Sequence, residues 1–243
     1  RARICTMEGL FDGGEFEDIR ENYKRISDNI NEAAIKAGRT DKPRFMAVTK
    51  TVPPERVNFA IGLGIDLLGE NRVQEYLEKR EAYAPAEVHF IGALQTNKVK
   101  YIIDKVSMIH SVNSVHLAEE INRRAASHGL TMDILAEINI GGEETKSGIS
   151  REDASVLLRG LGGLSNVRLR GLMAIPPPGC GEKPFADMRE LFEQTRETLL
   201  DEKRGAFDTL SMGMSGDYQT AIKFGATIVR IGSALFGQRK YPV

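Results

Sequence analysis

The sequence predicts an α/β fold, a single (β/α)8 barrel of the TIM type with an extra N-terminal helix. Short apolar segments alternate with segments of helical pattern along the chain, and no Pro- or Ser-rich linker divides it. The length of 243 residues is close to the roughly 250 residues typical of such barrels. Regular alternation predicts a parallel sheet, and eight units predict that it closes. A doubly wound open sheet is the structural alternative.

The extra helix comes first, at residues 16–37. Its apolar residues recur at steps of three and four, which predicts an amphipathic helix that ends at Gly38: Ile19, Tyr23, Ile26, Ile30 and Ala34. Residues 1–14, rich in glycine towards their end, are predicted to be a flexible segment, and residues 15–243 one barrel domain.

Strands and helices then alternate in chain order. The predicted strands are 44–49, 66–69, 88–92, 108–112, 133–140, 168–174, 209–212 and 227–231. The predicted helices are 54–63, 73–83, 97–105, 114–128, 151–161, 185–201 and 218–224, with a further short helix after Gly232. The loop Pro176–Pro184 is stiff and turn-rich, so it is a candidate wall of a site.

Composition narrows the function. Lys plus Arg (33) nearly cancel Asp plus Glu (34), so no global field favours nucleic acid or an anionic membrane, and a small-molecule partner is expected. Cys5 and Cys180 lack disulfide or metal-ligand spacing and indicate a reducing compartment, so we expect a cytoplasmic protein without a metal. No apolar run approaches the roughly 20 residues of a membrane helix, and residues 1–14 lack a signal-peptide pattern.

Polar residues at strand ends are the candidate site residues, because barrel active sites lie at the carboxyl ends of the strands. Lys50 closes the first predicted strand, where partial desolvation would lower its pKa and prepare it to form a Schiff base. The alternative is a rim lysine with its head in water.

A phosphate site is predicted near the C-terminus. The segments "SMGMSGDYQTAI" and "RIGSALFG" place Gly and Ser directly ahead of helices, after the last two strands, where barrels often hold phosphate. Arg230 shares a sheet face with Gly232 and could point inward. A lysine, a phosphate site and an inward arginine together fit pyridoxal 5′-phosphate (PLP), and the arginine would keep the pyridine nitrogen an unprotonated acceptor.

At these residues the sequence resembles the pyridoxal phosphate homeostasis protein family, relatives of the N-terminal barrel of alanine racemase. The matching segments occur in the family's order: "AVTKTVP", "LLGENRVQE", "HFIGALQTNKVK", "IHSVN", "EINIGGEETKSG", "LRGLMAIPP", "LSMGMSGDYQTAI" and "VRIGSALFG". The resemblance implies an internal aldimine between PLP and Lys50, phosphate contacts from Ser215, Gly232 and Ser233, and Arg230 at the pyridine nitrogen. It also implies that Asn71, Met212 and Met214 line the ring pocket.

The resemblance implies a carrier or regulator of PLP, with apo-enzymes as partners, and no established catalytic residues. A racemase would need a second acid/base, which alanine racemases take from a further domain, and we expect the chain to have no room for one. The oligomeric state is left open between a monomer and a weak homodimer. The alternatives are a PLP-dependent racemase of low activity, a cofactor-free Schiff-base aldolase and a plain interaction module.

Several other residues are candidate acids, bases or amines. His89 and His110 are expected to be hydrogen-bonded core histidines. Tyr218 and Tyr241 are the tyrosines nearest the predicted phosphate site, and either could be structural. Lys98 and Lys146 are expected to be solvated loop lysines.

Overall fold

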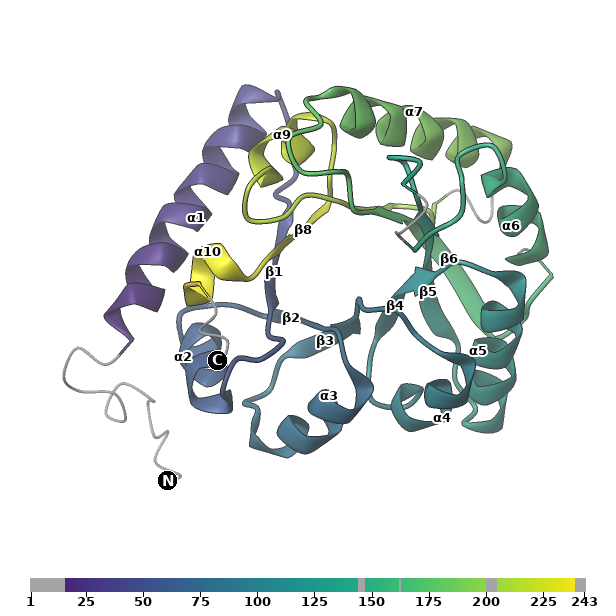
Figure 1. Cartoon of the computed structure of the whole chain (residues 1–243), viewed down its shortest axis with the longest axis horizontal. Coiled ribbons are helices and arrows are strands. Elements are labelled where there is room, and N and C mark those ends of the chain that lie inside the picture. Colours follow the sequence, from purple (N-terminus) through teal and green to yellow (C-terminus); the bar gives the residue numbers. More distant parts are fainter. Residues whose placement is uncertain (1–15, 144–146, 162, 200–204, 239–243) are drawn as a thin grey trace.

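Eight parallel strands form a closed barrel in the computed structural model, which describes residues 16–143, 147–161, 163–199 and 205–238 (Figure 1). Each strand pairs with the next, and the last pairs with the first. The strands are β1 (Arg44–Val48), β2 (Leu67–Glu70), β3 (Glu87–Phe90), β4 (Met108–Val112), β5 (Met132–Ile138), β6 (Val167–Ala174), β7 (Thr209–Ser211) and β8 (Ile228–Ile231). The predicted barrel is confirmed, and the open sheet is excluded.

Helices surround the barrel, as Figure 1 shows. They are α1 (Glu17–Lys36), α2 (Pro54–Gly62), α3 (Val73–Lys79), α4 (Val99–Ile102), α5 (Val115–Ser127), α6 (Ala154–Leu161), α7 (Lys183–Thr198), α9 (Tyr218–Lys223) and α10 (Ser233–Phe236). Two 3₁₀ turns, Arg80–Ala82 and Thr96–Lys98, adjoin α3 and α4. The predicted flexible segment 1–14 lies outside the described residues.

The helix predicted over residues 97–105 is wrong in form. The segment is a 3₁₀ turn followed by a single α-helical turn, and the backbone N–H of Lys105 then closes a turn on the carbonyl of Ile102. Only Val99, Ile102 and Ile103 of this stretch are fully buried, so one turn covers its part of the barrel. At α7 the helix begins at Lys183 rather than residue 185, because Pro184 is well suited to a first helical turn. The predicted end of that helix, residue 201, lies outside the described residues.

The long helix α1 packs over the two short helices that follow the last two strands. α9 and α10 have six and four residues, and α1 lies along both of them (Figure 1). Its buried face carries Ile19, Ile26 and Ile30. Asn29 Nδ2 donates to the Tyr218 hydroxyl at 2.9 Å, and Asn22 Nδ2 donates to the carbonyl of Leu235 at 3.1 Å. The extra helix therefore holds the segment that follows β8.

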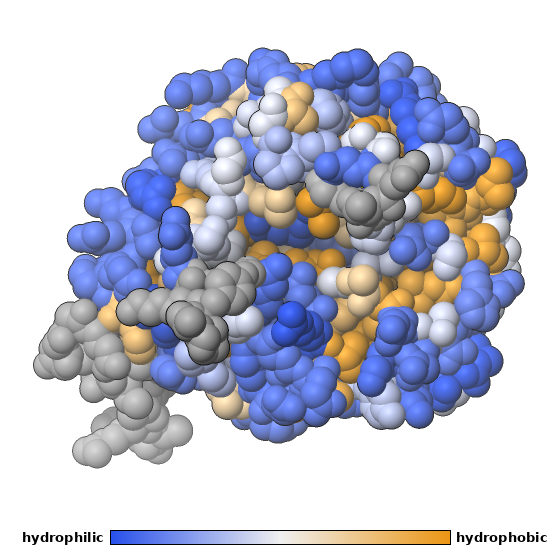
Figure 2. Space-filling model, viewed as in Figure 1, coloured by the Kyte–Doolittle hydropathy of each residue, from blue (hydrophilic) through white to orange (hydrophobic). Residues whose placement is uncertain are grey.

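The barrel interior has its own apolar clusters, separate from the large core between strands and helices. Met46, Leu67, Ile91 and Ile228 form one cluster, and Met108, Leu135 and Met173 form another. At the amino ends of the strands, Asp133 pairs with both Arg168 (2.6 Å) and Arg170 (2.7 Å). Figure 2 shows a hollow over the centre of the barrel, lined by both hydrophilic and hydrophobic residues.

Candidate functional site

Lys50 lies in the turn that follows β1, half-buried at the carboxyl end of the barrel. The residues on either side of it are anchored. Thr49 is fully buried, and its hydroxyl donates to Glu70 Oε1 at 2.7 Å. The backbone N–H of Thr51, which adopts a left-handed φ of 63°, donates to a carboxylate oxygen of Glu75. A β-branched residue in this conformation is held there only by its surroundings. The turn thus fixes the backbone that carries the Lys50 amine.

Glu70 is the buried support of this turn. Its Oε1 also accepts the Tyr83 hydroxyl at 2.7 Å, while its Oε2 is buried without a hydrogen-bond partner among the described residues. Burial raises the pKa of the Glu70 carboxyl above its ordinary value, because a charged carboxylate loses its water. The pKa of the Tyr83 hydroxyl is raised as well, first by burial and then by the neighbouring Glu70.

Arg230 lies inside the barrel on β8, which pairs with β1 so that Arg230 stands opposite Met46. Its side chain is buried, with only 4% of the residue exposed. Nη1 donates to Ser211 Oγ at 2.7 Å, and Nη2 donates to the carbonyl of Ala174 at 2.9 Å. Burial lowers the pKa of Arg230 to about 10, which still leaves it protonated at neutral pH. These contacts direct the side chain into the barrel, and its contact with a pyridine nitrogen stays a prediction.

The loops that follow β7 and β8 are joined to each other. The hydroxyl of Ser215 accepts the backbone N–H of Ala234 at 3.2 Å, and the N–H of Arg230 donates to the carbonyl of Gly213 at 2.9 Å. A Cβ at Gly232 would lie 3.3 Å from the Cβ of Val48, so the backbone there approaches β1 closely. Ser233 is exposed and begins α10. The structure therefore brings together Ser215, Gly232 and Ser233.

The residues predicted to line the ring pocket differ in burial and in contacts. Asn71 follows β2, and its Oδ1 is buried without a hydrogen-bond partner among the described residues. Met212 is fully buried in the main core cluster, and Met214 is half-buried with its N–H donating to Asp217 Oδ1 at 2.6 Å. A ring pocket lined by both methionines stays a prediction.

Two buried polar residues at the carboxyl ends of β4 and β5 were not predicted. Ser111 Oγ and Glu137 Oε2 are buried and, within the described part of the chain, lack hydrogen-bond partners. Burial raises the pKa of Glu137, although the nearby Arg230 charge opposes this. The signal in the sequence was an acidic residue within the apolar run "DILAEINI". Buried polar groups without partners are rare, so together with Asn71 Oδ1 they fit a site for a polar ligand.

Among the described residues, the other candidate acids, bases and amines are held in hydrogen bonds or are exposed. His89 and His110 are buried and hydrogen-bonded, as predicted. Tyr218 is buried, and its hydroxyl is bonded to Asn29. Lys98 is exposed, with its amine 5.8 Å from the centre of the Tyr101 ring. Lys146 and Tyr241 lie outside the described residues.

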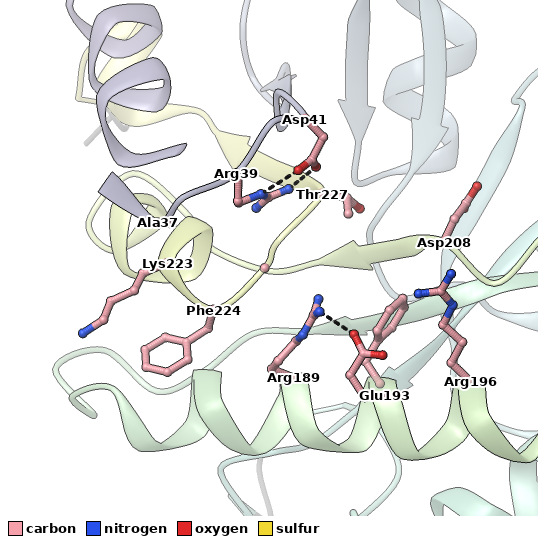
Figure 3. A pocket seen from close by; sticks show the side chains of 12 residues that line it. Ala37, Arg39, Asp41, Arg189, Glu193, Arg196, Asp208, Lys223, Phe224 and Thr227 are labelled. Carbon is pink, nitrogen blue, oxygen red and sulfur yellow. Dashed lines mark hydrogen bonds and ion pairs between the residues drawn. The ribbon is translucent and has the colours of Figure 1, made fainter. Parts of the chain in front are cut away.

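A separate cavity of about 510 Å³ lies near the amino ends of β7 and β8, between α7 and α9 (Figure 3). Its lining includes Arg39, Asp41, Arg189 and Glu193. Figure 3 shows that these four side chains pair with one another, Arg39 with Asp41 and Arg189 with Glu193. Because its charges are largely satisfied internally and barrel chemistry occurs at the opposite end, we do not assign the site here.

Within the described ranges, no group of three or more His, Cys, Asp or Glu side chains could hold a metal ion. The same part of the chain contains no helix long and apolar enough to cross a membrane.

Comparison with known proteins decides the family. Residues 22–240 match the family described as alanine racemase, N-terminal domain. The pyridoxal phosphate homeostasis protein of Aquifex aeolicus is 45% identical over 228 residues, which cover 91% of this chain and 98% of the relative. The chain belongs to the pyridoxal phosphate homeostasis protein family. The member from Pseudomonas aeruginosa is 41% identical over 226 residues, covering 92% of this chain and 96% of that one.

Solved structures of similar proteins share this barrel. A crystal structure from Bifidobacterium adolescentis is 34% identical with a TM-score of 0.86, covering 93% of this chain and 97% of that chain. PipY of Synechococcus elongatus PCC7942, solved with PLP bound, is 29% identical with a TM-score of 0.73 and covers 89% and 100% of the two chains. Alanine racemase of Clostridium difficile, at 19% identity and a TM-score of 0.71, shares the fold over 93% of this chain and 58% of its own length.

Proposed function

We propose that the chain binds PLP at the carboxyl end of the barrel, through an internal aldimine with Lys50, and acts in PLP homeostasis as a carrier or regulator. Membership of the pyridoxal phosphate homeostasis protein family and the PLP-bound structure of PipY support this proposal. The observation that carries it is the buried Arg230 guanidinium, fixed inside the barrel on the strand that pairs with the strand leading to Lys50. PLP would supply an aldehyde for the amine and a pyridine ring.

The donor set suits the different parts of this cofactor. A guanidinium has five N–H donors, and hydrogen bonds among the described residues use two of them, so donors remain for the pyridine nitrogen. Ser215, Gly232 and Ser233 would hold the phosphate, with backbone N–H groups as the main donors. Asn71, Met212 and Met214 would line the ring.

Arg230 also supports a binding role over turnover. Because arginine only donates, the pyridine nitrogen that faces it stays an unprotonated acceptor, and the ring withdraws electrons weakly. Carbanion chemistry on the cofactor is then poorly supported, whereas exchange of the aldehyde between Lys50 and another amine needs no such withdrawal. We therefore propose that apo-enzymes or free amines receive PLP from this chain.

An absorbance experiment tests the proposal. We expect the purified chain, incubated with PLP, to develop the visible band of a protonated aldimine, and Lys50→Ala to lack it. Lys98→Ala, which removes an exposed lysine from the 3₁₀ turn after β3, serves as the control and should keep the band. A wild-type chain that stays colourless would reject the cofactor and favour a cofactor-free aldolase or an interaction module.

A further inference from the structure

A line of hydrogen-bonded side chains crosses the barrel interior below Arg230. From Arg230 Nη1 the bond runs to Ser211 Oγ (2.7 Å), and from there to His110 Nδ1 (3.1 Å). His110 Nε2 contacts His89 Nδ1 at 2.9 Å, and His89 Nε2 contacts Glu87 Oε1 at 2.8 Å. Solvent does not reach the middle of this series of hydrogen bonds, because Ser211, His110 and His89 are each at most 1% exposed.

Arg230, at one end of this series, fixes the direction of every hydrogen bond in it. Arginine cannot accept, so Ser211 Oγ accepts from Arg230. Among the described residues the one acceptor within reach of the Ser211 proton is His110 Nδ1. His110 therefore carries its proton on Nε2 and donates it to His89 Nδ1, which leaves His89 with a proton on Nε2 to donate to Glu87.

The Glu87 end is consistent with the same direction. Arg44 Nη1 lies 2.8 Å from Glu87 Oε2, and Ser107 Oγ donates to Glu87 Oε1 at 2.9 Å, so a cation and a second donor hold this carboxylate as an acceptor. In the reverse direction, His89 Nε2 and the carboxylate would be two acceptors 2.8 Å apart, and the buried Ser211 proton would have no acceptor. Burial also lowers the pKa of His110 well below its ordinary value, which keeps that ring neutral.

We propose that Ser211, His110, His89 and Glu87 are positioning residues for Arg230, forming a proton-ordered chain that holds its guanidinium toward the cofactor. This series of hydrogen bonds starts at Glu87, at the amino end of β3, and ends at Arg230, towards the carboxyl end of the barrel. It therefore links the amino end of the barrel to the site. Its role toward the cofactor rests on the proposed binding of PLP, while its proton order rests on the hydrogen-bond geometry and the buried, neutral His110 described above.

Proton order is measured without PLP, in a variant that keeps Ser211, His110, His89 and Glu87 unchanged. The chain has four histidines, and His116 and His128 are exposed, so a His116→Gln/His128→Gln variant leaves only the two buried rings. In long-range ¹H–¹⁵N spectra we expect both rings to be neutral and protonated on Nε2. A ring protonated on Nδ1, or on both nitrogens, overturns the proposal.

The effect on the cofactor is measured with two hydroxyl deletions on β7. Ser211→Ala removes the acceptor of Arg230, and Thr209→Ala removes a second buried hydroxyl of the same strand, which bonds Asp208 instead. Losing one hydrogen bond to a charged group predicts about tenfold weaker PLP binding by Ser211→Ala, with a shifted visible band, and no change for Thr209→Ala. His110→Gln, whose amide can accept and donate in place of the ring, should restore more affinity than His110→Phe.

Unchanged affinity and an unshifted band in Ser211→Ala would overturn the positioning role. If the wild type binds no PLP, the proposed function fails and the role toward the cofactor fails with it. The tautomer measurement would still decide the proton order, so the two failures are distinguishable.

Discussion

The position of the Lys50 amine depends on hydrogen bonds made by the residues on either side of it. The residues on either side of Lys50 are bonded to Glu70 at the end of β2 and to Glu75 on α3. The amine is therefore placed by contacts made through its neighbours' side chain and backbone. Removing those contacts would alter the presentation of Lys50 without changing its chemistry.

Glu70 yields a prediction about pH. Because burial raises its pKa, the folded protein favours the protonated carboxyl, and wild-type stability falls as pH rises from the ordinary glutamate range, near about 4.3, through the folded pKa. Glutamine does not titrate and can still accept from Thr49 and Tyr83. We therefore expect the Tm of Glu70→Gln relative to wild type to rise between about pH 4 and pH 8.

Thermal melts at both pH values measure this difference, where about 2–4 °C corresponds to about 1 kcal/mol in a chain of this size. Glu119→Gln, an exposed change on α5, is the matched control. A Tm difference that is flat or falls with pH would show that Glu70 does not carry a stability cost from ionisation.

Sequence reasoning found the two most informative residues for a simple physical reason. Lys50 and Arg230 are charged groups at or near the ends of apolar strands, and the alternation of side chains along a strand predicts which face each occupies. It could not find the hydrogen bonds that extend from Arg230, because Ser211 and Ala174 lie 19 and 56 positions away, and Ser211 meets His110, 101 positions away, only across the closed barrel. The burial of Glu137 and Ser111 was missed for the same reason.

Among the elements, α1 makes the most specific contribution to the site. It packs on α9 and α10 and bonds to Tyr218 and to the carbonyl of Leu235, so it stabilises the segments that follow β7 and β8. Its amphipathic period was visible in the sequence. The sequence does not indicate which helices α1 covers, because that depends on the lengths of α9 and α10 in the folded barrel.

Two isoleucines of α1 give a matched test of this packing. Ile30 is 1% exposed and Ile35 is 74% exposed. We expect Ile30→Ala to lower the free energy of unfolding by about 2–5 kcal/mol through lost burial and a cavity, and Ile35→Ala to change it little. Urea denaturation measures both, and equal effects would show that α1 does not pack through the Ile30 face.

The element that sequence reasoning described wrongly is the segment 97–105. Its apolar residues, among them Val99 and Ile102, fit a helical period, but the period does not report how many turns the barrel needs at that point. The end of β3 and the start of β4 are close enough that a 3₁₀ turn and one α-helical turn complete the connection.

For the molecule as a whole, we expect binding of PLP without racemisation of amino acids, which distinguishes a carrier from a racemase. Tyr218, one of the tyrosines considered as a second acid/base, is buried and bonded to Asn29 of α1. The PLP-loaded chain is therefore expected not to racemise L-alanine above the rate of Lys50→Ala, even at high protein concentration. Chiral chromatography after prolonged incubation measures this. Racemisation that depends on Lys50 would instead identify a low-activity racemase.

The covalent role of Lys50 is the central claim, and borohydride reduction tests it most directly. After incubation with PLP, reduction and proteolysis, mass spectrometry should find the phosphopyridoxyl group on the peptide that contains Lys50, and not on those with Lys98 or Lys100. Modification in the absence of PLP, only when another carbonyl compound is added, would indicate a cofactor-free Schiff base. Absence of the group from Lys50, or equal labelling of exposed lysines, would contradict the account.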